Sequence, residues 1–100
     1  MRHQILKLRI SRSTKAERRA LEVFKRHHVL FRAKVIIKGR EIDFVIGKYT
    51  IDIDGHPQDS EKNRMLIGEG YAPIHFFNHE IPQQLELWLE HHYSDLSPRR

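Results

Sequence analysis

Hydrophobic and polar residues alternate along the middle of the chain with the period of two that is typical of β-strands. Alternation over 31–38 predicts a strand that ends at the turn residue Gly39. Two further strands, 42–46 and 49–54, flank Gly47-Lys48, a two-residue loop whose leading glycine suits a type II′ turn. Together these stretches predict an antiparallel meander of three strands.

Helical periodicity appears on both sides of this meander. Before it, the segment from Thr14 to about His28 carries apolar side chains three and four positions apart on one face and mostly basic side chains on the other. After it, Ser60 is a suitable cap for a second helix, 72–78 read as a short apolar strand, and Pro82 suits the first turn of a last helix. The expected architecture is an α+β domain with the order helix, three antiparallel strands, helix, strand, helix.

Length and composition predict one domain spanning 1–100. The chain has 100 residues, of which 39% are hydrophobic and 31% charged. Alternation over 4–10 suggests an extra strand within 1–12, and 94–100 are expected to fray.

The sequence contains no apolar run near the roughly 20 residues of a membrane span and no cysteine, so we expect a soluble cytoplasmic protein without disulfides or thiolate metal sites.

Charge is distributed unevenly along the sequence. Residues 1–40 hold 13 Lys or Arg against 2 Glu, a balance of +11, whereas residues 41–100 hold 5 against 11 Asp or Glu, a balance of −6. A basic segment favours a polyanionic partner, because cations that pair with phosphates release condensed counterions. Charge alone supports a solvated basic surface about equally well.

The predicted hairpin collects acidic side chains on one of its faces. With Gly47-Lys48 as the loop, Asp43 faces Asp52 and Glu41 faces Asp54. Side chains of the opposite parity form the expected core face, namely Ile42, Phe44, Ile46, Tyr49, Ile51 and Ile53. The second face is therefore expected to be a carboxylate cluster.

Such a cluster needs positive charge beside it. Two full negative charges about 5 Å apart repel by about 3 kcal/mol at an effective dielectric constant near 20. A divalent cation that prefers carboxylate oxygens would offset this repulsion between Asp43 and Asp52. A basic side chain from a neighbouring strand, Lys34 or Arg32, would offset it as well. Both interpretations stay open at this point.

Several motifs, taken in order along the chain, resemble one nuclease family. They are Thr14-Lys15-Ala16-Glu17, Asp43-Phe44, Asp52-Ile53-Asp54-Gly55-His56, Gly70-Tyr71 and Phe76-Phe77-Asn78-His79-Glu80-Ile81. This set resembles the small very-short-patch-repair-like endonuclease domains of the PD-(D/E)XK superfamily. The sequence departs from the usual pattern at Asp54, where the superfamily mostly has lysine, and at His56, which follows Gly55 directly.

The resemblance implies a restriction-endonuclease-like fold and metal-assisted hydrolysis of DNA phosphodiester bonds. Asp43, Asp52 and Asp54 would hold Mg²⁺ or Mn²⁺, which would activate a bound water. Glu17, His56 and Lys62 complete the catalytic candidates. The side chains that would grip the DNA backbone are Arg18, Arg19, Lys25, Arg26, Arg32 and Lys34.

Other interpretations stay open beside this one. The missing motif lysine favours a module of the same fold that binds nucleic acid without cutting it. A third interpretation is an interaction domain that would pair with a partner chain through the strand at 4–10. The same strand is the expected edge of a homodimer. Glu17 has a second interpretation, since it completes a capping box with Thr14. For His75, whose alternation turns it toward the acidic face, a structural hydrogen bond is the simpler interpretation.

Overall fold

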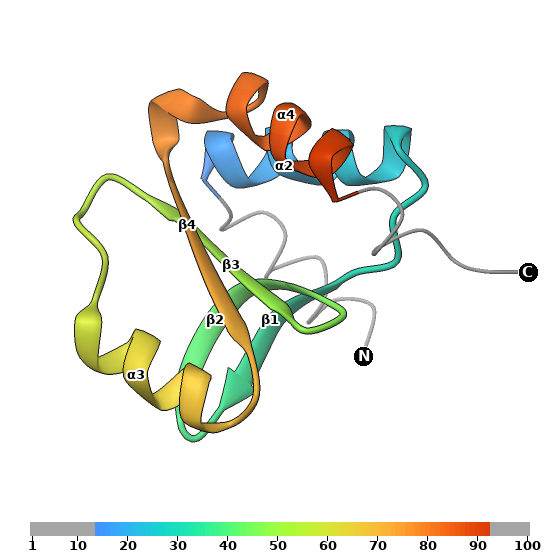
Figure 1. Ribbon diagram of the computed structural model, residues 1–100. Coiled ribbons are helices and arrows are strands. Elements are labelled where there is room, and N and C mark those ends of the chain that lie inside the picture. Colours follow the sequence, from blue (N-terminus) through green and yellow to red (C-terminus); the bar gives the residue numbers. More distant parts are fainter. Residues whose placement is uncertain (1–13, 93–100) are drawn as a thin grey trace, which may run out of the picture.

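A four-stranded sheet with helices on both faces forms the centre of the computed structural model, which describes residues 14–92 (Figure 1). The elements are α2 (Lys15–Arg26), β1 (Arg32–Ile37), β2 (Arg40–Ile46), β3 (Tyr49–Asp54), α3 (Ser60–Gly68), β4 (Ala72–Phe77), the 3-10 turn η1 (Asn78–Glu80) and α4 (Gln83–His91). The strands lie in the order β1-β2-β3-β4, with the first three antiparallel and β4 parallel to β3. The predicted α+β order is confirmed.

Two of the predictions fall outside the described residues, namely the extra strand at 4–10, with its dimer edge, and the tail at 94–100. Within residues 14–92 there is no helix whose length and apolar character would let it cross a membrane.

The hairpin turn and the first helix cap follow from local sequence. Gly47 has φ +58, a left-handed conformation that glycine adopts without strain, and the pairing that starts there reaches Phe44 opposite Ile51, as predicted. The Thr14 hydroxyl accepts from the N–H of Glu17 at 3.1 Å, and the Glu17 carboxylate accepts from the N–H of Thr14 at 3.3 Å. The capping box is therefore present.

The sheet is buried on both faces, whereas the alternation predicts a single core face. The larger cluster lies under α2 and α4 and contains Ala16, Ala20, Val23, Phe24, Val29, Phe44, Ile46, Ile51, Ile53, Phe76, Ile81, Leu85 and Leu89. The smaller cluster, under α3, contains Ile42, Val45 and Leu66. Because α3 covers this second face near the hairpin turn, Val45 and Thr50 are buried there, and the acidic side chains occupy only its uncovered end.

Ile42 lies on the opposite face from the one predicted. It packs under α3 with Leu66, not under α2 with Phe44. The change coincides with a bend of β1 at Lys34, which lies between the pairs Ala33–Phe44 and Val35–Ile42 and has φ 55. A left-handed residue inside a strand changes the face to which the following side chains point, so simple alternation fails across this position.

Burial in the larger core predicts that replacing a buried isoleucine lowers the free energy of unfolding more than replacing an exposed one. Ile51 is 0% exposed and Ile36 is 58% exposed. We expect Ile51→Ala to lower the free energy of unfolding by about 2–5 kcal/mol and Ile36→Ala to change it by less than about 0.5 kcal/mol, both measured by urea denaturation. Equal losses in the two variants would contradict this core.

Candidate active site

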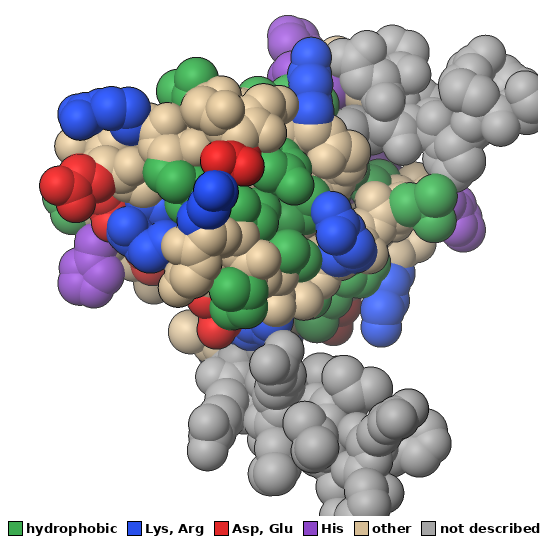
Figure 2. Space-filling view, turned by 90° about the horizontal axis from the view of Figure 1, so that it is seen from below, with side chains coloured by type: hydrophobic (Ala, Val, Ile, Leu, Met, Phe, Trp, Pro, Cys, Tyr) green, Lys and Arg blue, Asp and Glu red, His purple; other side chains and the backbone are tan. Residues whose placement is uncertain are grey.

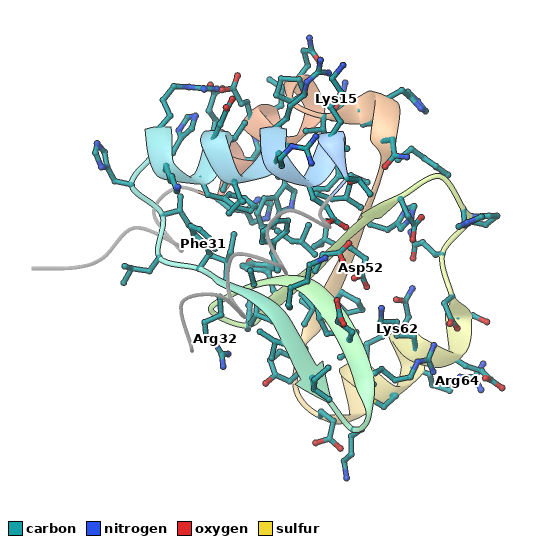
Figure 3. The ribbon with its side chains drawn as sticks, turned by 180° about the vertical axis from the view of Figure 1, so that it is seen from behind. Lys15, Phe31, Arg32, Asp52, Lys62 and Arg64 are labelled. Carbon is teal, nitrogen blue, oxygen red and sulfur yellow. The ribbon has the colours of Figure 1, made fainter. Side chains whose placement is uncertain are left out.

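One row of side chains crosses all four strands at the level of the bend. Asp52 of β3 pairs with His75 of β4, and continuing the register of the neighbouring pairs places Asp43 of β2 level with Asp52 and Lys34 of β1 level with Asp43. From α3, the ammonium of Lys62 reaches the same row and lies 2.9 Å from Asp52 Oδ2. Figure 3 shows Asp52 and Lys62 close together.

Asp43 and Asp52 connect β2 to β3 beyond the last backbone pair, that of Phe44 with Ile51. Asp43 Oδ2 accepts from the N–H of Ile53 at 2.8 Å, and Asp52 Oδ1 accepts from the N–H of Asp43 at 3.1 Å. Each carboxylate takes the place of a carbonyl in the ladder, so the backbone fixes its orientation. The second oxygen of each carboxylate faces a lysine, with Lys34 3.8 Å from Asp43 Oδ1 and Lys62 2.9 Å from Asp52 Oδ2.

Lys34 lies inside the acidic cluster. Its ammonium is 3.0 Å from Glu17 Oε1, 3.7 Å from Glu41 Oε2 and 3.8 Å from Asp43 Oδ1. Burial opposes the charge of Lys34, but its hydrogen bond to Glu17 and the charges of the surrounding carboxylates outweigh burial and raise its pKa. Compensation by a basic side chain of β1 is therefore present, and Lys34 supplies it, while Arg32 is exposed and lies well apart from Asp52 in Figure 3.

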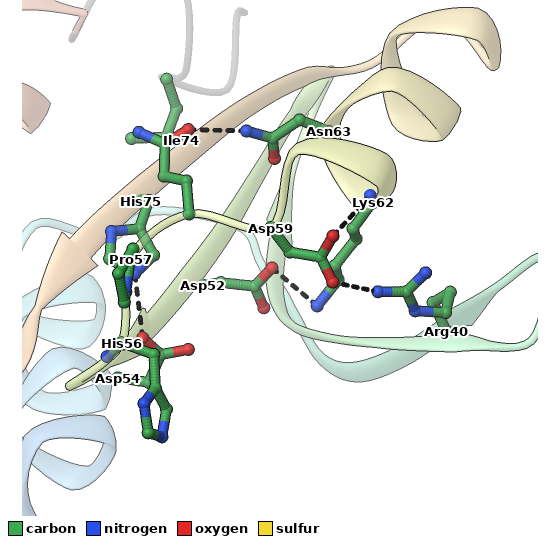
Figure 4. A pocket seen from close by; sticks show the side chains of 11 residues that line it. Arg40, Asp52, Asp54, His56, Pro57, Asp59, Lys62, Asn63, Ile74 and His75 are labelled. Atoms are coloured by element: carbon green, nitrogen blue, oxygen red, sulfur yellow. Dashed lines mark hydrogen bonds and ion pairs between the residues drawn. The ribbon is translucent and has the colours of Figure 1, made fainter.

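The first turn of α3 holds Lys62 in place. Asp59 caps the helix by accepting from the N–H of Lys62 at 3.0 Å, one residue earlier than the predicted cap Ser60. Arg40 of β2 pairs with the same carboxylate of Asp59 (Figure 4). The Lys62 ammonium donates to a backbone carbonyl of β2 at 2.8 Å in addition to its contact with Asp52. The backbone N–H of Lys62 and its ammonium group are thus both held by hydrogen bonds.

Asp54, at the end of β3, contacts the ring of one histidine and the backbone of another. Its Oδ1 lies 2.9 Å from His75 Nε2 and accepts from the backbone N–H of His56 at 2.9 Å. Although burial works against ionisation, these contacts lower the pKa of Asp54. The sequence gives only a weak signal for His75, because its partner depends on how the parallel strands β3 and β4 align.

All six predicted catalytic side chains line one cavity of about 370 Å³. They are Glu17, Asp43, Asp52, Asp54, His56 and Lys62, and the remaining lining residues are Thr14, Glu41, Ile53, Gly55 and Asn78. A neighbouring cavity of about 330 Å³ shares Asp52, Asp54, His56 and Lys62 and extends to Arg40 and His75 (Figure 4). The fold brings these side chains together from four elements and a loop, while their catalytic roles stay predictions.

Acidic groups outnumber basic ones in this site. The carboxylates of Glu17, Glu41, Asp43, Asp52 and Asp54 face the two ammonium groups of Lys34 and Lys62. Burial, together with the charges of Glu17 and Asp52, raises the pKa of Asp43 to about 7. Across the described range 14–92, no three His, Cys, Asp or Glu side chains are arranged to hold a metal ion. The three predicted metal ligands therefore do not form a ready-made group.

The side chains predicted to grip DNA lie on different surfaces. Those on α2, Arg18, Arg19, Lys25 and Arg26, are exposed, and Arg26 pairs with Glu86 of α4. On the face shown in Figure 2, seen from below, Lys and Arg side chains are scattered among apolar, acidic and uncharged ones. Contact between these residues and DNA stays a prediction.

Comparison with known proteins finds a similar fold. No protein-family model and no curated protein matches the chain. Among solved structures, the homing endonuclease I-Bth0305I catalytic domain matches with a TM-score of 0.69 and 18% sequence identity, over 83% of this chain and 97% of that one. The two share a fold. At this identity the likeness concerns the fold, so activity has to be argued from the side chains.

The environment of Asp43 predicts a pH dependence of stability. Its pKa is about 7 in the folded protein against the ordinary 3.8. Between these values the folded state binds more protons than the unfolded state, so stability falls as the pH rises, by a total on the order of 4 kcal/mol. We expect Asp43→Asn, which keeps an oxygen for the N–H of Ile53, to remove most of this decrease when Tm is measured from pH 4 to pH 8.

A matched control is Glu90→Gln on the exposed face of α4, which should keep the pH dependence of the unaltered protein. If Asp43→Asn keeps it as well, burial of Asp43 is not its source.

Proposed function

We propose that this protein is a metal-dependent DNA endonuclease of the PD-(D/E)XK type, akin to the very-short-patch-repair-like domains. The observation that carries the proposal is the arrangement of Asp43 and Asp52 on neighbouring strands, with the Lys62 ammonium 2.9 Å from Asp52, at a cavity that both acids line. A fold similar to that of a homing endonuclease catalytic domain supports it.

The donor set of Asp43 and Asp52 fits Mg²⁺ or Mn²⁺. In proteins Mg²⁺ commonly takes one or two carboxylates and fills its remaining positions with water and substrate phosphate. Asp43 has the most to gain from added positive charge, because burial raises the pKa of its carboxyl to about 7. When bound, such an ion lowers the pKa of a coordinated water and polarises the scissile phosphate.

Lys62 supplies the positive charge that the superfamily usually places at the position of Asp54. It comes from α3 instead of β3, and its contacts with Asp52 and with a β2 carbonyl hold the ammonium beside the paired acids. An ammonium there stabilises negative charge that develops on the phosphate and orients the attacking water. Lys62 thus takes over the function of the missing motif lysine.

The other acids have supporting roles in this proposal. Asp54, positioned by His75, and the side chain of His56 line the same cavity and are the groups that accept or deliver a proton during hydrolysis. Glu17 is held by its capping box and by Lys34, so it positions the site and does not act on substrate. The exposed Arg18 and Arg19 directly follow Glu17 in the sequence of α2 and would contact backbone phosphates.

Loss of nicking in Asp52→Asn tests the proposal. We expect the unaltered protein to nick supercoiled plasmid with Mg²⁺ or Mn²⁺ but not with EDTA, and Asp52→Asn to be slower by roughly 100-fold or more, because one carboxylate of the pair loses its charge. Agarose gel electrophoresis of timed samples gives the rates. The control Glu69→Gln changes an exposed acid that pairs with Lys38 near the β1–β2 turn, and it should keep full activity.

Two results would count against a nuclease. Nicking that is unaffected by Asp52→Asn would mean a contaminating enzyme or another site. Salt-sensitive DNA binding without cleavage, in either metal and on linear, supercoiled and mismatched DNA, would favour the non-cutting binding module, in which Lys34 and Lys62 permanently neutralise the acids.

Lys62→Met separates the role of this lysine from general basicity. We expect nicking to fall by roughly 100-fold or more with little change in DNA affinity, because the ammonium acts at the reacting phosphate. Lys48→Met, in the exposed hairpin turn, removes the same charge away from the cavity and should leave the rate unchanged. A Lys62 variant that loses only DNA affinity would show that this lysine is a backbone contact.

A further inference from the structure

We propose that Lys34 is the internal counter-ion of this cavity, and that a divalent cation binds there only as the Lys34 ammonium is displaced. The inference rests on the proposed function and deepens it, because it assigns to Lys34 control of metal affinity in place of the predicted grip on DNA.

The contacts of Lys34 are those of a counter-ion. Its ammonium lies between carboxylates from two further elements, 3.0 Å from Glu17 of α2 and 3.7 and 3.8 Å from Glu41 and Asp43 of β2. Its side chain is only 22% exposed. A lysine that serves DNA phosphates extends its ammonium into solvent, whereas this one directs it toward the acids.

The backbone of β1 is shaped to deliver this side chain. Lys34 has φ 55, an uncommon conformation for a non-glycine residue inside a strand, and the register of the neighbouring pairs places it level with Asp43. Structure around a residue must favour such a conformation for it to persist. Here the bend aims the ammonium at the acidic cluster, and its attraction to three carboxylates supplies the favourable term.

The two lysines of the site are not equivalent. Lys62 donates to a backbone carbonyl as well as contacting Asp52, so it keeps an anchor when the charge around it changes. The contacts described for Lys34 are with carboxylates only, Asp43 among them. A divalent ion on Asp43 would repel an ammonium 3.8 Å from the same carboxylate, and this local repulsion is what would drive the Lys34 ammonium away.

Removal of this ammonium should therefore strengthen metal binding. We expect isothermal titration calorimetry with Mn²⁺ alone, without DNA, to show roughly tenfold tighter binding for Lys34→Met than for the unaltered protein. The matched control is Lys38→Met, since Lys38 also has a positive φ, of 51°, and also pairs with a carboxylate, Glu69 at 3.6 Å, but outside the cavity. Its Mn²⁺ affinity should not change.

The possible failures can be told apart. Suppose that the unaltered protein binds Mn²⁺ and that the double variant Asp43→Asn, Asp52→Asn does not. If Lys34→Met then binds Mn²⁺ no more tightly than the unaltered protein, the inference is wrong while the metal site stands. If no variant binds Mn²⁺, the metal site fails and the inference fails with it. If Lys34→Met has reduced DNA affinity and unchanged Mn²⁺ affinity, the inference is wrong and the predicted contact of Lys34 with the DNA backbone is supported.

A measurement on the unaltered protein covers the case in which Lys34→Met does not fold. Acetylation of lysine amines, followed by mass spectrometry of the peptides, reports how accessible each ammonium is. We expect Mg²⁺ to speed the acetylation of Lys34 several-fold relative to Lys38, because the displaced side chain enters solvent. Equal rates with and without saturating Mg²⁺ would overturn the displacement.

Discussion

The replacement of backbone carbonyls by aspartate oxygens between β2 and β3 is the interaction on which the rest of the site depends. Because the N–H groups of Ile53 and Asp43 bond to carboxylates, the two acids are oriented by the sheet itself and cannot turn away from each other without leaving donors unpaired. Their repulsion has to be met by positive charge, and Lys34 of β1 and Lys62 of α3 supply it.

This arrangement of like charges lowers the stability of the folded protein. Five carboxylates around two ammonium groups leave the cavity short of positive charge. Burial, with the charges of Glu17 and Asp52 added to it, raises the pKa of Asp43. A site designed only for stability would replace such acids by apolar or amide side chains. The excess negative charge has a physical purpose if a cation and a water-derived nucleophile are handled there.

Much of this could be predicted from the sequence, because local signals are strong. The glycine in the Gly47-Lys48 loop fixes the hairpin register, and with it the meeting of Asp43 and Asp52. The change of face at Ile42 could not be predicted, since it occurs beside a left-handed Lys34 that no alternation reveals. Contacts between distant elements, such as His75 with Asp54, depend on the alignment of β4 beside β3 and have no local signature.

The parallel pairing of β3 with β4 brings two connecting segments to the same end of the sheet. Because both strands run the same way, they end together at Asp54 and Phe77, and the segments that follow, 55–59 and 78–80, leave from one rim beside the acids. Loops tolerate insertion and substitution far better than paired strands do. Changes to the length or sequence of that rim should therefore disturb the row of charged side chains across the sheet less than changes within the strands would.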